Sequence, residues 1–322
     1  MGAPAPQGHR MTGEARWAGI VAVSFIWGST WLAIKVGLGS MPPFLSAGMR
    51  FAIAAGILSA LAWASGVAPP REPRVHAGLV ALGFLNFVVN YGVVYWGEQY
   101  VSSGLTAVLF ATYPLFVLLI AHFAIGAERI TARKLAGVAL GFAGVGVIFR
   151  SDLALDDPRA TIAVAVILVS PVASALTSVG IKKWGHDLHP YTLTALPMAY
   201  GAVVLTAIGI ATENPRAIEW NAVSIGALLY LALFGSVVAF VVYYRLLKVV
   251  PVSLLALVSY AFPIVAVALG WLVLQEALSG STLAGAGMVL IGIALATWRR
   301  RGSGPGATGG GPVEAVTPAS PK

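Results

Sequence analysis

The chain has 322 residues, of which 58% are hydrophobic and only 10% are charged, and its mean hydropathy is +0.85. A soluble domain is usually about 25% charged, so this composition leaves too few polar residues to cover a water-facing surface. The chain has no cysteine, which excludes disulfides and thiolate-bound metals. Its net charge of +8 is spread between apolar runs instead of forming one patch, so no nucleic-acid partner is expected.

Apolar runs long enough to cross a bilayer follow one another along the whole chain, each at or near the roughly 20 residues that a spanning helix needs. The first run begins at Trp17 and is too long for the core of a signal peptide, so we expect it to be retained as a span. Prolines, glycines and charges divide the chain into ten predicted spans, at 17–38, 44–65, 76–97, 102–125, 133–149, 160–181, 191–211, 221–244, 252–274 and 282–298. Residues 1–16 and 299–322 are predicted to be disordered tails.

An internal repeat decides the predicted architecture. The polar turn and glycine-rich run that begin at Glu128 return at Glu276, 148 residues later. The same separation joins Leu135 to Leu283, Gly137 to Gly285, Gly144 to Gly292 and Tyr95 to Tyr243. One shared separation is unexpected by chance, so we interpret 17–150 and 160–298 as two related halves.

The distribution of basic residues predicts the orientation of these halves. With a cytoplasmic N-terminus, fifteen Lys and Arg residues fall on the cytoplasmic side and four on the opposite side. Both termini are therefore predicted to be cytoplasmic. Each half then has five spans, an odd number, so the two halves must lie in opposite orientations. Inverted repeats of this kind are typical of secondary transporters, whose site lies near the midplane between the repeats.

Three motifs carry a family resemblance: W-G-S-T-W at Trp27–Trp31, M-R-F-A at Met49–Ala52, and E-R-I-T followed by L-A-G from Glu128, with a second copy from Glu276. With these motifs the chain resembles the ten-helix, EamA-type branch of the drug/metabolite transporter superfamily over about residues 17–298. The second half lacks the Trp-Gly pair and has Met198 where the first half has Arg50.

The resemblance implies an all-α integral membrane protein with ten transmembrane helices in two inverted five-helix repeats. It also implies a small-molecule carrier, usually an exporter of amino acids, metabolites or drugs. The substrate cavity is then expected between the halves, lined mainly by helices 1, 3, 4, 6, 8 and 9. No cofactor or metal is expected.

Two asparagines are the clearest polar candidates within a predicted span. Asn86 and Asn90 are spaced i and i+4, so they share one helix face, and their second-half counterparts are Phe234 and Val238. An amide in hydrocarbon is costly unless it is paired, so such residues face the bundle interior or a wet cavity. Contact with the substrate and structural hydrogen bonding between helices are the two interpretations.

Tyrosines cluster in the predicted third, fourth, eighth and ninth spans. Tyr113 and Tyr260 lie centrally, shortly before Pro114 and Pro263, which interrupt the helical hydrogen bonding and predict either a hinge or a static kink. A ring with a hydroxyl suits a pocket for small amphipathic molecules, although tyrosines near span ends also form interfacial belts.

Arg50 is a charge within the predicted second span. It is predicted either to bind a carboxylate of the substrate, or to snorkel to the interface or pair with carbonyls at the repeat boundary. Together with the span-1 motif and its counterpart, the candidate substrate-binding residues are Trp27, Ser29, Thr30, Arg50, Asn86, Asn90, Tyr91, Tyr95, Tyr113, Thr177, Ser178, Tyr243 and Tyr260.

Alternatives from other functional classes have weaker support. A membrane enzyme needs a catalytic or metal cluster, and the H-D-L-H segment at His186–His189 is better interpreted as a solvated loop. A channel needs a continuous polar stripe, which these apolar spans lack. No Asp or Glu lies in the middle of a predicted span, which weakens coupling through an acidic relay. We therefore expect an alternating-access exporter in the cytoplasmic membrane, with a small-molecule substrate and the lipid bilayer as partners and a homodimer as an alternative to the monomer.

Overall fold

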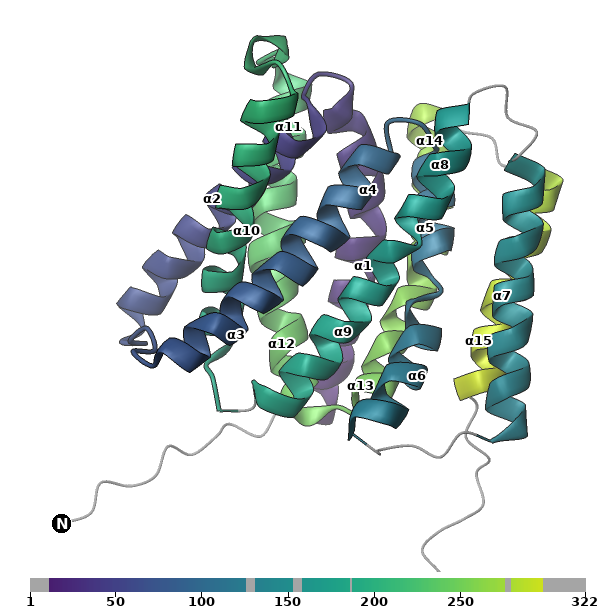
Figure 1. Cartoon of the computed structure of the whole chain (residues 1–322), viewed down its shortest axis with the longest axis horizontal. Coiled ribbons are helices and arrows are strands. Elements are labelled where there is room, and N and C mark those ends of the chain that lie inside the picture. Colours follow the sequence, from purple (N-terminus) through teal and green to yellow (C-terminus); the bar gives the residue numbers. More distant parts are fainter. Residues whose placement is uncertain (1–11, 126–130, 153–157, 186, 276–278, 298–322) are drawn as a thin grey trace, which may run out of the picture.

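A computed structural model describes residues 12–125, 131–152, 158–185, 187–275 and 279–297. The described residues form a bundle of long helices with no strand (Figure 1). Seven helical stretches in them are long and apolar enough to cross a membrane, and Ala261–Leu274 and Leu283–Gly292 are shorter apolar helices. The all-α fold predicted from the sequence is confirmed.

The first half contains five helical stretches, three continuous and two interrupted. The continuous helices are α1 Gly13–Leu38, α2 Pro43–Ala64 and α7 Ala132–Asp152. The third stretch runs through α3 Pro73–Gly83, the π-helical η1 Phe84–Asn90 and α4 Tyr91–Gly97, and the fourth through α5 Ser103–Phe110 and α6 Tyr113–Ile125.

The second half follows the same plan. Its helices are α8 Pro158–Ile167, α9 Val169–Trp184, α10 Pro190–Thr212, α11 Ala222–Tyr230, the π-helical η3 Leu231–Val238, α12 Ala239–Val249, α13 Val252–Leu255, α14 Ala261–Leu274 and α15 Gly280–Thr297. The short 3₁₀ segments η2 Pro215–Ala217 and η4 Ala256–Tyr260 lie between them. All ten predicted spans correspond to these stretches, and each predicted end falls within five residues of the observed one.

Prolines explain several breaks in the helices, and some irregularities recur at equivalent positions of the two halves. α5 ends before Thr112 and Pro114, and η4 precedes Pro263, so the predicted mid-span interruptions are present in both halves. α8 ends at Ile167, four residues before Pro171, because a proline ring clashes with the carbonyl four residues earlier. The π-helical segments η1 and η3 occupy equivalent positions of the two halves, and neither contains a proline that would predict it.

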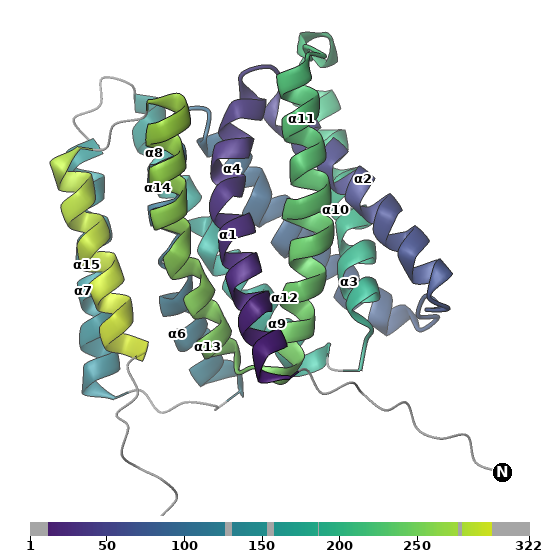
Figure 2. The ribbon, with the colours of Figure 1, turned by 180° about the vertical axis from the view of Figure 1, so that it is seen from behind.

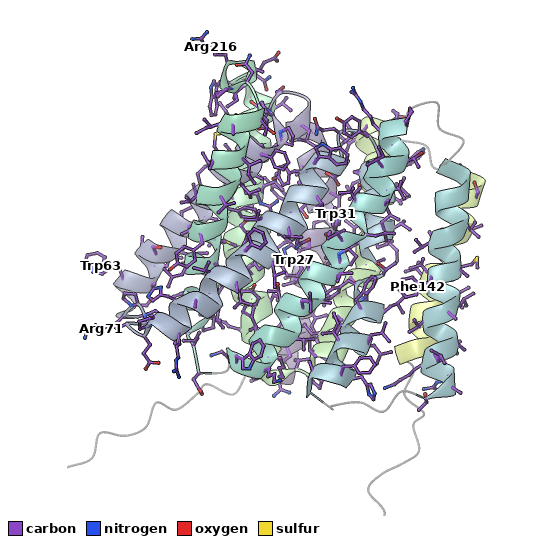
Figure 3. All side chains as sticks on the ribbon, in the orientation of Figure 1. Trp27, Trp31, Trp63, Arg71, Phe142 and Arg216 are labelled. Carbon is purple, nitrogen blue, oxygen red and sulfur yellow. The ribbon has the colours of Figure 1, made fainter. Side chains whose placement is uncertain are left out.

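The two halves run in opposite directions through the bundle. Figure 2 shows the start of α1 and the end of α15 at the same end of the molecule, whereas α8, which opens the second half, begins at the other end. The largest hydrophobic core joins both halves around Phe87, Tyr95, Phe240 and Leu255. Side chains fill much of the space between the ribbons (Figure 3).

α7 and α15 form a pair at one side of the bundle. They pack against each other through glycines, because a methyl group built on Gly144 would lie 2.6 Å from the carbonyl oxygen of Gly285, and one on Gly292 would lie 2.5 Å from that of Gly137. Gly144 and Gly292 are equivalent positions of the repeat, and so are Gly137 and Gly285, so the two helices contact each other through equivalent residues. The glycines therefore allow these two helices of one chain to approach closely. Glu128 and Glu276, which open the two motif copies, lie outside the described residues.

Candidate functional site

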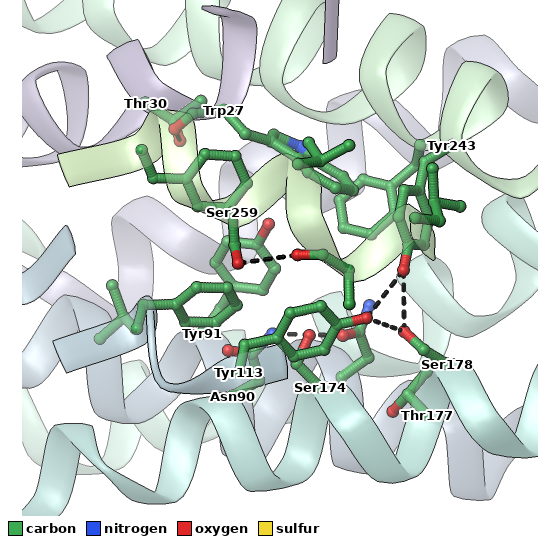
Figure 4. Close-up of a pocket in the computed structure, with 18 of the residues that line it drawn as sticks. Trp27, Thr30, Asn90, Tyr91, Tyr113, Ser174, Thr177, Ser178, Tyr243 and Ser259 are labelled. Atoms are coloured by element: carbon green, nitrogen blue, oxygen red, sulfur yellow. Dashed lines mark hydrogen bonds between the residues drawn. The ribbon is translucent and has the colours of Figure 1, made fainter. Parts of the chain in front are cut away.

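A pocket lies at the centre of the bundle, between the two halves (Figure 4). Its walls come from α1, η1, α4, α5, α6, α9, α12, α13, η4 and α14, which are the predicted helices 1, 3, 4, 6, 8 and 9. Its volume is about 50 Å³. Its wall contains tryptophan, tyrosine, phenylalanine, asparagine, serine and threonine side chains, and none of its described residues has a formal charge.

Nine of the thirteen candidate residues line this pocket. Those from the first half are Trp27, Thr30, Asn86, Asn90, Tyr91 and Tyr113. Those from the second half are Thr177, Ser178 and Tyr243. The structure therefore brings together residues that lie as far apart as 27 and 243 in the sequence.

Two hydrogen bonds link the amides of η1 with a serine hydroxyl of α9. Ser170 Oγ donates a short hydrogen bond to Asn90 Oδ1, and Asn90 Nδ2 donates to Asn86 Oδ1 at 3.2 Å. Only 3% of Asn86 and 4% of Asn90 are exposed, so both amides are desolvated as predicted for this helix face. Asn86 Nδ2 has no hydrogen-bond partner among the described residues. In this arrangement the remaining donor, Asn86 Nδ2, points away from Asn90.

Three hydroxyl groups form a closed hydrogen-bonded group, here called the hydroxyl triangle. Tyr113 OH donates to Ser178 Oγ at 2.8 Å, Tyr113 OH and Tyr243 OH are 2.8 Å apart, and Ser178 Oγ and Tyr243 OH are 3.2 Å apart. Tyr113 belongs to the first half, and Ser178 and Tyr243 belong to the second. The triangle therefore links α6, α9 and α12 across the boundary between the halves (Figure 4).

Aromatic rings build most of the remaining wall. The ring of Trp27 lies 4.9 Å from that of Tyr243 and 5.1 Å from that of Phe240. The ring of Trp31 lies 5.3 Å from that of Phe110 and 6.4 Å from that of Phe262. Such pairs provide rigid apolar surface for a ligand.

Several residues of the pocket wall are outside the predicted set, among them Trp31, Phe110, Ser174, Phe240, Tyr244, Ser259 and Phe262. A signal was available for Trp31, because it follows Trp27 by four residues and so shares its helix face. The apolar rings gave no comparable signal, since most phenylalanines in such a chain face lipid or the core.

Arg50 lies behind the pocket wall and does not line the pocket. It is fully buried, and its Nε donates to Ser236 Oγ at 2.9 Å while its two terminal nitrogens donate to Tyr95 OH at 3.3 Å and to the Gly235 carbonyl at 3.4 Å. Its guanidinium also lies 4.9 Å from the ring centre of Tyr91. Of the interpretations offered above, this geometry matches pairing with a carbonyl at the repeat boundary, because Gly235 belongs to the second half.

The remaining candidates lie elsewhere. Ser29 is hydrogen bonded to Tyr230 OH at 2.6 Å, on the side of α1 that faces α11, and Tyr95 is fully buried against Arg50. The backbone of Tyr260 ends η4, and its side chain lies outside the described part. His186 is likewise outside the described residues, and the described ones contain no group of three or more potential metal ligands.

Comparison with known proteins gives a consistent result. The profile of the EamA-like transporter family matches this chain twice, over residues 17–150 and 161–298. The uncharacterized inner membrane transporter YedA of Escherichia coli (strain K12) is 33% identical over 283 residues, which cover 86% of this chain and 89% of YedA. The uncharacterized transporter YoaV of Bacillus subtilis (strain 168) is 28% identical over 280 residues, covering 87% and 96% of the two chains.

A solved crystal structure of a protein with 22% sequence identity superposes with a TM-score of 0.66 and covers 88% of this chain and 97% of its own. This similarity supports the ten-helix fold. The family and the two relatives are transporters and not enzymes. With two copies of the family's unit across most of its length, the chain is a multi-pass membrane transporter that belongs to the EamA-like transporter family.

Proposed function

We propose that this protein exports a small organic molecule by alternating access and binds it in the central pocket. The observation that carries the proposal is the position of the pocket: residues of both inverted halves build its wall. A site at the boundary between inverted repeats can be exposed to either face by rocking one half against the other. The proposed binding residues are the nine candidates that line the pocket, with Trp31 added.

The small volume of the pocket supports a transport cycle in which the pocket is contracted in one state and wider in another. A volume of about 50 Å³ holds one or a few water molecules, since a single water needs at least roughly 10–15 Å³. A metabolite therefore needs the walls to separate. The hydroxyl triangle joins the two halves at the wall, so opening toward its side requires these hydrogen bonds to break.

We further propose that the protein lies in the cytoplasmic membrane with both termini in the cytoplasm, because fifteen of nineteen basic loop and tail residues then fall inside. The reciprocal glycine contacts of α7 and α15 occur within one chain, so these glycine faces are not free for a contact between two copies. The exported compound is expected to be one that the cell makes, such as an amino acid or another metabolite.

The test compares small molecules in the medium of cells that overproduce the wild type, Asn90→Ala or the matched control Gly146→Ala, with an empty-vector culture. A methyl group at Gly146 meets nothing within 4 Å, so this control should behave as wild type. We expect one compound to accumulate outside cells with wild type or the control and to accumulate less with Asn90→Ala at matched expression. Identical media in all four cultures would contradict export of the measured compounds.

A further inference from the structure

A crevice separates the end of α2 from the start of α10. Its walls come from the last turns of α2, the loop at 66–69 and the first turns of α10, and its volume is about 610 Å³, against about 50 Å³ for the central pocket. The two cavities share no lining residue. None of the described residues that line the crevice has a formal charge, and Val67, Ala195 and Leu196 are among its apolar ones.

The sequence repeat explains why α2 and α10 separate at one end. At the other end they approach closely, because a methyl group built on Gly48 would lie 3.0 Å from a backbone nitrogen of α10, and one on Gly209 would lie 2.9 Å from a backbone nitrogen of α2. The equivalent positions at the crevice end, 148 residues away, are Leu196 and Leu61. Glycines allow two helix backbones to approach, whereas leucine side chains keep them apart.

Hydrogen bonds also close the end of the pair opposite the crevice. Glu213, which follows α10, accepts from the backbone N–H groups of Phe44 and Leu45 at the start of α2, at 2.8 and 2.9 Å. These bonds hold a helix of the first half to a helix of the second. Figure 1 shows α2 leaning away from α10 toward the other end, so the pair forms a wedge that is open at its proposed cytoplasmic end.

The crevice opens at the surface of the bundle, where lipid covers a membrane protein. Ser59 and Trp63 in its wall are exposed, Trp63 to 85%, and Tyr191 lines the opposite wall. Tryptophan and tyrosine near the ends of spanning helices are typical of the membrane interface. Water finds few hydrogen-bond partners in an apolar crevice, whereas an acyl chain can fill it. The position and the wall of the crevice therefore favour a lipid tail.

Basic side chains border the first wall of the crevice. Arg71 and Arg74 are exposed and follow the lining loop directly in the sequence. Figure 3 shows Arg71 and Trp63 at the same edge of the bundle. The acidic Glu72 lies between the two arginines in the sequence. This wall therefore has more positive than negative charge at its margin.

The second wall has a positive margin as well. The pKa of His189, which immediately precedes α10, is lowered first by desolvation and then by the positive charges of Lys248 and Arg245. Asp187 is the acidic residue near Lys248. Together with the two arginines and the glutamate of the first wall, four basic side chains outnumber two acidic ones around the crevice.

We propose that the crevice binds one anionic phospholipid of the inner leaflet, with an acyl chain between α2 and α10 and the phosphate at Arg71 and Arg74. Basic residues at the cytoplasmic ends of spanning helices attract anionic head groups. A zwitterionic lipid has the same tails without a net charge, so it lacks this attraction. The proposal goes beyond transport, because it assigns a ligand to a part of the molecule outside the central pocket.

The test is native mass spectrometry of the purified, delipidated full-length protein with phosphatidylglycerol or with phosphatidylcholine of identical acyl chains. We expect one phosphatidylglycerol to remain bound at about a tenfold lower lipid concentration than phosphatidylcholine requires, because each basic residue near a head group contributes about fivefold. Equal binding of the two lipids would overturn the proposal. So would several equally retained copies, which indicate lipid over the whole surface, or a dimer without lipid, which assigns the crevice to a second copy.

One pair of variants tests the position of the acyl chain. Ser59→Trp places a large ring in the crevice from an exposed position. Ala60→Trp is the matched control, because Ala60 is also exposed on α2 and does not line the crevice. We expect Ser59→Trp to lose the retained copy of either lipid and Ala60→Trp to bind as wild type does. Wild-type binding by a folded Ser59→Trp would place the lipid elsewhere and overturn the proposal.

A second set of variants tests the head group. In the double variant Arg71→Ala with Arg74→Ala, two basic and two acidic side chains remain around the crevice, so we expect a lipid still to bind and its preference for phosphatidylglycerol to fall to about twofold or less. Arg216→Ala, exposed beyond the opposite end of α10, should keep the wild-type preference. An unchanged preference in the double variant would overturn the assignment of the phosphate. The melting temperature of each variant without lipid shows that it is folded.

The result is independent of the proposed export. Selective binding of one phosphatidylglycerol together with identical media in the export comparison would support the lipid site and reject export of the measured compounds. Export by the wild type together with equal binding of the two lipids would reject the lipid site and leave the proposed function in place.

Discussion

Arg50 illustrates how a single side chain joins the two halves. Its guanidinium reaches Ser236 and the Gly235 carbonyl of η3 from α2, and it also contacts Tyr95 and the ring of Tyr91. Guanidinium has five N–H donors in a planar fork, so one residue can serve several acceptors and an aromatic face together. In a membrane interior, this residue is better explained as a structural link next to the pocket than as a snorkelling anchor.

Replacing Arg50 should therefore destabilise the protein. In Arg50→Ala the lost packing and hydrogen bonds are expected to reduce the free energy of unfolding by about 2–5 kcal/mol. Arg50→Lys should recover part of this, because an ammonium keeps the charge but cannot span the same acceptors. Thermal unfolding of the purified variants measures the effect, with the exposed Arg216→Ala as the control. Equal melting temperatures for Arg50→Ala and Arg216→Ala would show that the link contributes nothing.

At the scale of elements, the α7–α15 pair depends on the absence of side chains at two positions. Gly144 and Gly292 each approach a backbone carbonyl of the partner helix, whereas Gly146 on α7 and Gly287 on α15 have nothing within 4 Å of an added methyl group. Alanine substitutions at these four glycines thus form two matched pairs. On each helix, one glycine is in close contact with the partner helix and the other has free space around it.

Gly144→Ala and Gly292→Ala are expected to lower the stability by about 1–3 kcal/mol, the usual cost of overpacking. Gly146→Ala and Gly287→Ala should be neutral or stabilising by up to about 1 kcal/mol, because alanine favours a helix over glycine. The readout is the melting temperature of each purified variant. If all four substitutions have the same effect, close backbone approach does not hold the pair together.

The start of α10 is capped by a histidine side chain. His189 Nδ1 accepts a hydrogen bond from the backbone N–H of Tyr191 at 3.2 Å, which requires this nitrogen to be unprotonated. The pKa of His189 is lowered from its usual 6.5, first by desolvation and then by the positive charges of Lys248 and Arg245. The folded state therefore binds fewer protons at this site than the unfolded state does, between the lowered pKa and 6.5.

The cap is expected to contribute its full stabilisation above about pH 6.5 and to lose it as the pH falls toward the lowered pKa. In His189→Asn, which keeps a favourable N-cap without a titrating group, the melting temperature should fall less between pH 7.5 and 5.5 than in wild type. The measurement is the melting temperature across this range. Parallel curves for the two proteins would exclude His189 as a source of pH dependence.

Most element positions follow directly from the sequence, and the details that shape the pocket do not. Hydrophobic runs and breakers locate all ten helices, and Pro114 and Pro263 predict the mid-span breaks of the fourth and ninth. The π-helical segments η1 and η3 are not predictable in this way, because an extra residue per turn results from tertiary packing and has no local breaker. Asn90, by contrast, was recognisable as a candidate because an amide in hydrocarbon needs a partner.

The exact set of residues that line the pocket is not predictable from the sequence for the same reason, because it depends on tertiary packing. Residue type and span placed Asn86 and Tyr113 at the pocket wall, but they could not distinguish Ser29, which turns toward α11, from Thr30, which faces the pocket one residue later. That difference depends on the rotation of α1 about its axis. Helix rotation is set by packing against several neighbours at once, which one sequence without its three-dimensional contacts does not encode locally.

At the scale of the whole molecule, two inverted halves make a prediction that can be tested without a substrate. The loop after the second helix contains Arg71 in the first half, and its equivalent in the second half, 148 residues later, is Glu219. In a parallel repeat the two positions would lie on the same face of the membrane. In an inverted repeat they must lie on opposite faces.

The absence of cysteine makes the experiment direct, because a single introduced cysteine is then the only maleimide target in this chain. Both positions are exposed, so substitution should not disturb the fold. With intact cells, we expect a membrane-impermeant maleimide to label Glu219→Cys and to leave Arg71→Cys unlabelled until the membrane is permeabilised. Labelling of both from outside would contradict the inverted arrangement. The reverse pattern would keep the inversion and place the termini outside, against the excess of basic residues on the predicted cytoplasmic side.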